Sequence, residues 1–213
     1  DLLFSNVYYV LLLIQKDPRL IELLWKNMWK ETHYAGRGAP VSFAIAAVDV
    51  ALWDLKAKCL NEPLWRLLGG HKNNIIAYAG NIDLNFTKEK LLDGATKSLE
   101  KGFQTIKMRL GRANLSDDIA RLDAMRNHLP DNINMMADAN EAWRVDQAVQ
   151  AVKEIERFNL VWLEEPIKID DFKGYAYLRS LGKVPLAAGE NLHTLAEFNH
   201  LINLEGIDFL EPD

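Results

Sequence analysis

The sequence lacks several features that would place the chain outside the ordinary globular proteins. Its 213 residues contain one cysteine, Cys59, so no internal disulfide can form. A reducing, cytoplasmic location is the simplest expectation. Basic charge is not in excess, because 25 Lys and Arg stand against 30 Asp and Glu, giving a net charge of −5. This balance predicts neither a nucleic-acid partner nor a basic surface for membranes.

Long hydrophobic runs are also missing. The most hydrophobic stretch, residues 7–14 (VYYVLLLI), is far shorter than the ~20 apolar residues that a membrane span needs. No basic segment precedes it and no small-residue cleavage site follows it, so we expect a buried helix or strand rather than a signal peptide. With 49% hydrophobic and 26% charged residues, the chain has enough apolar side chains for a sizeable core, and disorder is excluded.

Helical patterns dominate the first seventy residues. Ile21, Leu24, Trp25 and Met28 fall on one face of a helix that begins after Asp17-Pro18. A loop at residues 33–40 follows. Residues 43–60 are rich in alanine and almost apolar all round as far as Trp53, which predicts a buried helix.

From residue 75 onward, short apolar runs alternate with helical segments. The runs are residues 75–79, 105–110, 133–137, 160–163, 184–188 and 207–210. This order predicts a parallel sheet with helical crossovers, either an open doubly wound sheet or a (β/α)₈ barrel. No G-x-G-x-x-G follows the first run and no P-loop is present, which weakens the case for a nucleotide-binding open sheet.

Acidic residues stand at the carboxyl ends of three successive predicted strands. Asp138, Glu164 and Glu190 are spaced 26 residues apart in each step. Neighbouring strands lie roughly 4.8 Å apart, so these carboxylates would crowd and repel one another in a barrel. A hard cation such as Mg²⁺ would relieve that repulsion. Taken singly, each could instead be a helix cap or an exposed loop acid, but three matched positions favour a metal site.

Two cations precede these acids on the strand at residues 105–110. Lys107 and Arg109 point to the same side, because side chains alternate along a strand. Buried cations are costly unless anions meet them. The functional interpretation is that both face the metal and a carboxylate-bearing substrate. The alternative is that they reach out to solvent at the rim of the barrel.

With these residues in place, the sequence resembles the mandelate racemase and muconate lactonizing enzyme family of the enolase superfamily. The resemblance covers nearly the whole chain, in order and spacing. It rests on residues 43–70, 106–109 (IKMR), 137–140 (ADAN), 162–166 (WLEEP), 189–191 (GEN) and 211–213 (EPD).

The resemblance implies an α/β fold: a (β/α) barrel of the enolase-superfamily type, incomplete here with about six strands, preceded by part of an α+β capping domain. Residues 1–42 would be the remnant of the capping domain, and residues 43–213 the first part of the barrel. It implies that Asp138, Glu164 and Glu190 bind Mg²⁺ in a reaction that begins by removing the proton α to a carboxylate.

The same resemblance assigns catalytic roles to Lys107, Arg109 and Asp213. Lys107 would neutralise the substrate carboxylate. Arg109 stands where many members have a basic lysine, and a guanidinium is a poor base. This departure weakens the case for a racemase, which needs a base on each side of the α-carbon. It favours dehydration of a sugar acid to a 2-keto-3-deoxy acid. Asp213 would pair with a histidine on the next strand, which lies beyond the chain end.

The remaining expectations concern the substrate and the assembly. Asn140 and His193 are candidate substrate-binding residues, although His193 could equally be a polar loop residue. Glu165 is expected to hold Lys107 or a neighbouring cation. The partner would be a small-molecule carboxylate, with no nucleic acid or membrane, and a homo-oligomer is possible. The alternatives are a racemase or epimerase, or a truncated family member without activity, since about six of eight strands should not be catalytically competent.

Overall fold

The computed structural model describes residues 12–212, so residues 1–11 and Asp213 lie outside the description. The chain forms two compact units, residues 1–75 and residues 76–213. The assignment of residues 1–42 to a capping domain and of residues 43–213 to the barrel stays a prediction.

The N-terminal unit is helical in its described part. It contains α2 (Ile21–Glu31), the 3₁₀ helix η1 (His33–Ala35), α3 (Ala39–Cys59) and α4 (Leu64–Leu67). Both long helices were predicted, and Pro40 in the first turn of α3 explains its start. Met28 of α2 and Ile45 of α3 are buried together in a small core.

The apolar helix α3 is less buried than its composition predicts. In this unit only Ser42, Ile45 and Ala57 of α3 are buried. Phe43 and Val50 are 59% and 61% exposed. The reason is that α3 packs mainly on α2 within its unit, which covers only one side of a helix that is apolar all round.

No helix between residues 12 and 212 is both long enough and apolar enough to cross a membrane. The predicted buried run at residues 7–14 falls mostly outside the described residues.

The C-terminal unit is a six-stranded parallel sheet in the sequential order β1-β2-β3-β4-β5-β6. Its strands are β1 (Ala79–Gly80), β2 (Thr105–Arg109), β3 (Asn134–Asp138), β4 (Leu163–Glu164), β5 (Leu186–Ala188) and β6 (Phe209–Leu210). Each of the six predicted runs overlaps one strand, although β1 and β4 share only a single residue with their runs. Sequential order and parallel pairing are the arrangement of a (β/α) barrel and not of a doubly wound sheet.

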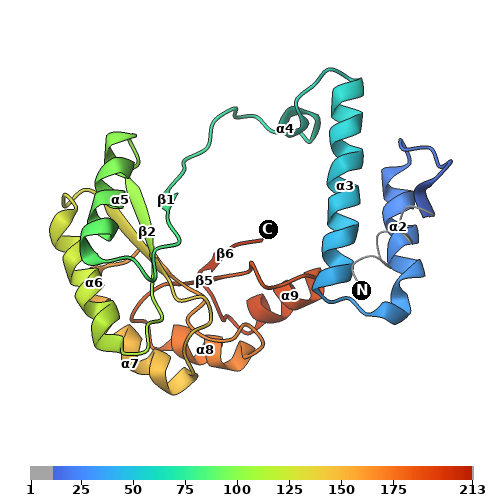
Figure 1. Cartoon of the computed structure of the whole chain (residues 1–213). Helices are drawn as coiled ribbons and strands as arrows, with labels where there is room; N and C mark the ends of the chain where they lie inside the picture. The colour runs from blue at the N-terminus through green and yellow to red at the C-terminus, as the bar shows by residue number, and fades with distance from the viewer. Residues whose placement is uncertain (1–11, 213) are drawn as a thin grey trace. The chain divides into compact units, whose positions relative to one another are not determined.

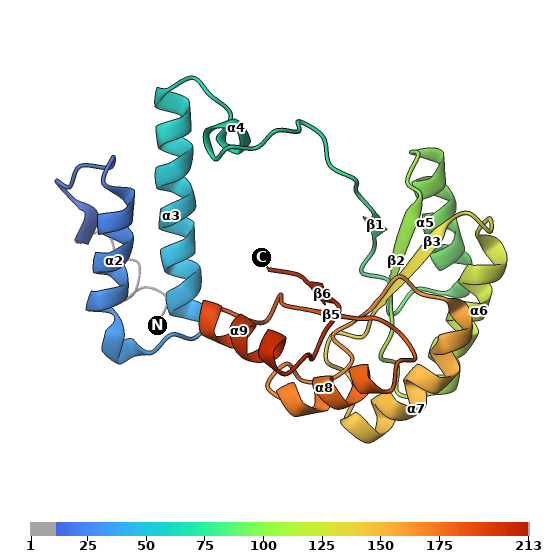
Figure 2. The ribbon, with the colours of Figure 1, turned by 180° about the vertical axis from the view of Figure 1, so that it is seen from behind.

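Helices connect successive strands and lie along the outside of the curved sheet (Figures 1 and 2). They are α5 (Lys88–Glu100), α6 (Leu115–His128), α7 (Val145–Ile155), the short η2 (Glu156–Phe158), α8 (Phe172–Ser180) and α9 (Leu195–Asn203). One face of α7, formed by Ala148, Ala151, Val152 and Ile155, is buried in the core between sheet and helices. Full burial of a side chain the size of Val152 or Ile155 contributes roughly 1.5–3 kcal/mol.

Local hydrogen bonds and backbone angles define several helix ends. Thr194 and Glu197 form a capping box at the start of α9. Gly102 and Gly182 have positive φ values of 90° and 63°, as C-terminal caps require. After α9, Glu205 has a positive φ of 55°.

Candidate active site

The carboxyl ends of the parallel strands bring the predicted acids to one edge of the sheet. Asp138 is the last residue of β3 and pairs in register with Glu164, the last residue of β4. Glu190 follows the end of β5 by two residues. Arg109, the last residue of β2, is in register with Asp138. Residues distant in sequence therefore share one edge, as the strand-end spacing predicted.

Lys107 connects the two buried acids of this edge. Its Nζ donates to Glu164 Oε2 at 2.6 Å and to Asp138 Oδ2 at 3.4 Å. Burial of the Lys107 side chain acts to lower its pKa, but the hydrogen bond to Glu164 and the charges of Glu164 and Asp138 outweigh burial, so the pKa is raised. Lys107 is therefore a fixed cation that faces the site and not solvent at the rim.

Arg109 lies beside Lys107 and contacts the same acidic edge. Its guanidinium forms an ion pair with Asp138 and a hydrogen bond to the side-chain oxygen of Asn140. Asn140 in turn donates from Nδ2 toward Glu190 Oε1 at 3.5 Å, at the limit of a hydrogen bond. Asn140 therefore bridges the cationic side of the site and Glu190.

Two glutamates near this edge, Glu164 and Glu211, are destabilised in their charged form. Burial raises the pKa of Glu164, and the nearby charge of Asp138 adds to the shift, while Lys107 opposes it. Burial also raises the pKa of Glu211 to about 8, with Glu164 the largest neighbouring charge. Trp162 Nε1 donates to Glu164 Oε2 at 3.3 Å. Crowded carboxylates with raised pKa values form a site that an added cation would stabilise.

Glu165 was expected to hold Lys107 or a neighbouring cation, and its side chain is instead hydrogen-bonded to Asn191. Its two carboxylate oxygens accept from Asn191 Nδ2 at 3.1 and 2.8 Å. Burial raises the pKa of Glu165 to about 7, and the Glu190 charge adds to that shift. The prediction failed because Lys107 reaches the neighbouring Glu164, so Glu165 takes its partner from the loop after β5.

The backbone is strained around these acids. Asn140, Glu141 and Glu165 have positive φ values of 41°, 58° and 38°. Such values are uncommon for residues other than glycine and gather at functional sites. The Glu141 N–H donates to the Glu165 carbonyl at 2.7 Å, which joins the loops that follow β3 and β4.

The donor set suits a hard divalent cation, although the acids are arranged around cationic side chains. Within residues 12–212, no group of three or more His, Cys, Asp or Glu side chains is close enough together to hold a metal ion as it stands. Lys107 and Arg109 instead neutralise Asp138 and Glu164. The fit to Mg²⁺ rests on donor chemistry: carboxylate oxygens at successive strand ends, of which those of Asp138 and Glu164 are buried.

For two predicted site residues, His193 and Asp213, the structure gives little or no information on the side chain. His193 lies in the loop between β5 and α9, where its backbone N–H donates to Glu197 Oε2 at 2.9 Å. Its assignment to the substrate stays a prediction. Asp213 lies outside the described residues.

Sequence reasoning missed a buried ion pair behind Arg109. Arg121 Nη2 donates to Asp83 Oδ1 at 2.8 Å, and the two residues are 5% and 1% exposed. A buried arginine on a helix, paired with a buried aspartate 38 residues earlier in the chain, leaves no periodic signal. Arg121 lies on α6, where the neighbouring Leu122 is also buried, and that burial is visible only in the structure.

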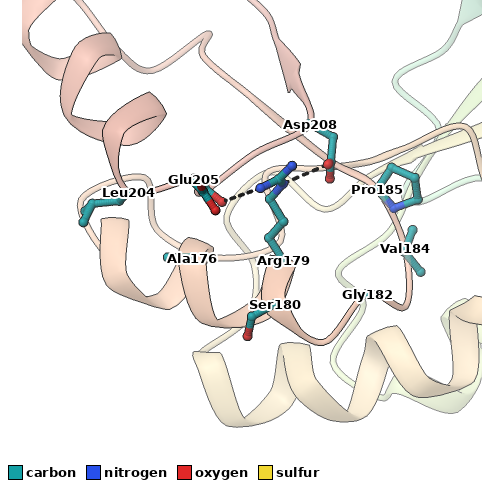
Figure 3. Close-up of a pocket in the computed structure, with 9 residues that line it drawn as sticks. All are labelled: Ala176, Arg179, Ser180, Gly182, Val184, Pro185, Leu204, Glu205 and Asp208. Carbon is teal, nitrogen blue, oxygen red and sulfur yellow. Dashed lines mark hydrogen bonds and ion pairs between the residues drawn. The ribbon is translucent and has the colours of Figure 1, made fainter.

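A separate cavity of about 350 Å³ opens at the opposite end of the strands, near the start of β5 and β6 (Figure 3). Arg179 in its wall donates to Asp208 Oδ1 at 2.8 Å and to the Glu205 carbonyl at 3.1 Å. Its cation is therefore already paired with a carboxylate. The cavity lies away from the strand-end acids and adds nothing to their chemistry.

Each of the two units matches a known protein-family model. Residues 90–213 match the family model described as enolase C-terminal domain-like. Residues 5–69 match the mandelate racemase / muconate lactonizing enzyme N-terminal domain.

Individual relatives include several activities. The chain is 42% identical over 201 residues to a 3,6-anhydro-alpha-L-galactonate cycloisomerase of Streptomyces coelicolor, covering 94% of this chain and 56% of the relative. It superposes with a TM-score of 0.92 on a Streptomyces coelicolor racemase crystallised with bound magnesium, at 42% identity, covering 95% of this chain and 60% of the other.

A third similar structure carries a sugar-acid ligand. The L-talarate dehydratase of Polaromonas sp. JS666, complexed with Mg and L-glucarate, superposes with a TM-score of 0.91 at 36% identity, covering 100% of this chain and 60% of the other. The chain spans about half the length of the curated relatives it matches.

Proposed function

We propose that this chain, which belongs to the mandelate racemase and muconate lactonizing enzyme family of the enolase superfamily, is part of a Mg²⁺-dependent enzyme that removes the proton α to a substrate carboxylate. The proposed reaction is β-elimination from a sugar acid, giving a 2-keto-3-deoxy acid. The substrate is a small-molecule carboxylate and the setting is cytoplasmic.

One observation carries the proposal: two cations and the strand-end acids share one edge of the sheet. Lys107 lies within hydrogen-bond reach of both Asp138 and Glu164, and Arg109 contacts Asp138. Removing a proton beside a carboxylate gives an enediolate with two negative charges. Preorganised cations stabilise that charge where it develops.

In the proposed site, Asp138, Glu164 and Glu190 would hold Mg²⁺. When bound, the metal supplies positive charge that lowers the barrier to enediolate formation. Enzymes of this superfamily are a standard example of Lys or His bases working with Mg²⁺, so the pattern is general and not particular to this chain.

Lys107 and Arg109 would act on the substrate without exchanging protons with its α-carbon. Lys107 donates to the substrate carboxylate and keeps its proton, since its raised pKa makes it a poor base. Arg109 presents a planar guanidinium group that stays protonated. The side-chain oxygen of Asn140 accepts from Nη1 of Arg109, the same nitrogen that contacts Asp138. The proton would be taken by a group beyond the described residues, paired with Asp213.

The leaving group distinguishes two forms of the same elimination. In dehydration, the hydroxyl on the β-carbon leaves as water. In a 3,6-anhydro sugar acid, the β-carbon carries a ring ether instead, and elimination opens the ring without loss of water. The 42% identity to a cycloisomerase that acts on such a compound makes ring opening a specific second candidate.

The test is a screen of the full-length protein with Mg²⁺ against aldonic, aldaric and 3,6-anhydro sugar acids, read by formation of a 2-keto product. We expect product from at least one acid, and its absence from all of them would contradict the proposal. A racemase or epimerase would instead exchange the α-proton with solvent deuterium and form no 2-keto product.

A further inference from the structure

The strand β1 ends before it can pair with the last residue of β2. Its residues Ala79 and Gly80 are in register with Ile106 and Lys107. In a parallel strand, the N–H and C=O of one residue point to the same neighbour. Arg109, two residues beyond Lys107, therefore turns both backbone groups toward a position where β1 has already stopped.

Asp83 and Arg121 satisfy these two backbone groups. The Arg109 N–H donates to Asp83 Oδ1 at 3.0 Å. The Arg109 carbonyl accepts from Arg121 Nη2 at 3.3 Å, and the same Nη2 donates to Asp83 Oδ1 at 2.8 Å. On its other side, β2 continues its pairing through the Leu110 N–H and the Asp138 carbonyl at 2.7 Å. The ion pair thus replaces the missing residue of β1.

This pair is a costly way to stabilise a fold. Burial raises the pKa of Asp83 and lowers that of Arg121, so each charged form is disfavoured by its surroundings. Asp83 Oδ2 and Arg121 Nε have no hydrogen-bond partner among the described residues. Buried ion pairs of this kind are often no more stabilising than apolar replacements. A role in placing a neighbour accounts for the pair better than stability does.

The neighbour that it places is Arg109. Arg109 carries the guanidinium that contacts Asp138 and Asn140 in the site, and its peptide group is held by Asp83 and Arg121 from behind. We propose that Asp83 and Arg121 are positioning residues that fix the backbone of Arg109 and thereby aim its guanidinium at the developing negative charge of the substrate. The inference rests on the proposed function.

The experiment removes both charges together, so that no unpaired buried charge is left. In the full-length protein, Asp83→Ala with Arg121→Met should lower kcat by about 10- to 100-fold, the cost of a small misplacement of a reacting group. KM should change less than about threefold, because substrate binding is shared with other groups. Asp83→Asn with Arg121→Met is the matched neutral pair. It keeps an acceptor for the Arg109 N–H and should recover part of the lost kcat.

A double-mutant cycle separates positioning from general structure. In an Arg109→Ala background, Asp83→Ala with Arg121→Met should change kcat by less than about twofold, because the guanidinium to be aimed is gone. An equal loss of kcat in both backgrounds would overturn the proposal. Asp123→Asn on the same helix, whose carboxylate pairs with Arg157 at the surface, is the control and should leave kcat unchanged.

A readout without substrate keeps this inference distinct from the proposed function. Amide hydrogen exchange at Arg109 should accelerate in the Asp83→Ala, Arg121→Met protein and slow again in the Asp83→Asn, Arg121→Met protein. An Arg109 amide equally protected in all three proteins would refute the positioning role. If the wild type forms no 2-keto product from any acid, the proposed function fails, and the exchange rates still decide whether the pair fixes Arg109.

Discussion

The ammonium nitrogen of Lys107 lies 2.6 Å from Oε2 of Glu164, although 57 residues separate them in the chain. The contact joins β2 to β4 across β3, whose last residue, Asp138, lies 3.4 Å from the same ammonium. One cation thus neutralises the ends of two strands. Lys107, Asp138 and Glu164 are therefore electrostatically coupled, so that removing the charge of one changes the stability of the charged forms of the other two.

Glu190→Gln tests the metal assignment. Glutamine keeps the size of the side chain and its oxygen acceptor but removes one negative charge. We expect Mg²⁺ affinity of the full-length protein to fall at least ~10- to 100-fold, the range found when even an outer partner of a ligand is lost. Turnover should vanish while the thermal midpoint stays close to that of the wild type. The measurements are a Mg²⁺ titration by calorimetry and a thermal melt.

The matched control is Glu154→Gln, at an exposed glutamate on α7. It should leave both Mg²⁺ affinity and turnover unchanged. Unchanged Mg²⁺ dependence in the Glu190→Gln protein would refute the assignment.

Arg109→Lys tests whether this position holds charge or accepts protons. Lysine is a point charge on a shorter side chain and lacks the planar guanidinium whose Nη1 contacts both Asp138 and Asn140. We expect turnover to fall by about 10- to 1,000-fold, the scale of losing a preorganised donor. The pH profile of turnover should gain no new basic limb. The measurements are turnover against pH and deuterium exchange at the α-carbon for both proteins.

The opposite result would reassign the residue. If Arg109→Lys gained exchange at the α-carbon at undiminished turnover, Arg109 would occupy the position of a base. Racemisation would then be favoured over elimination.

Gly189→Ala should destabilise the protein next to Glu190. Gly189 has a φ of 154°, and an added Cβ would lie 2.5 Å from the Glu211 carbonyl oxygen. Strained backbone and an overpacked contact together cost on the order of 3 kcal/mol. We expect a clear fall in the thermal midpoint and weaker Mg²⁺ binding. Gly38→Ala is the control, because a Cβ there meets nothing within 4 Å and its φ is not positive. Equal midpoints for the two variants would contradict this account.

The capping box of α9 should make stability depend on pH. Burial acts to raise the pKa of Glu197, but hydrogen bonds from His193 and Thr194 outweigh it and lower the pKa. Because the folded pKa lies below the unfolded value of about 4.3, the stabilisation is present above that pH and is lost as pH falls through the folded pKa. The difference in unfolding free energy between wild type and Glu197→Gln should therefore shrink below pH ~4.

Denaturant unfolding of both proteins at a series of pH values between about 3 and 6 measures this difference. Glu154→Gln again serves as the control, since its carboxylate takes part in no cap. A difference that stays constant over this range would show that the Glu197 charge contributes nothing to the cap.

Local patterns along the chain determined much of the fold. The 3.6-residue period of Ile21, Leu24 and Met28 set α2, and six apolar runs between helices set the sheet. Strand ends fixed the shared edge of Asp138, Glu164 and Glu190, because parallel strands all end on the same side. These features depend on residues close together in the chain, so they can be predicted from the periodicity of apolar residues.

Tertiary structure alone decided which side chains meet. Lys107 binds Glu164 while Glu165 binds Asn191, whereas the sequence pattern predicted that Glu165 holds Lys107 or another cation. The pairing of Asp83 with Arg121 behind Arg109 depends on where β1 happens to stop, which no run of residues records. Such contacts join segments that are 26 to 57 residues apart. They follow from strand register and from the competition of buried charges for partners, and both exist only once the chain is folded.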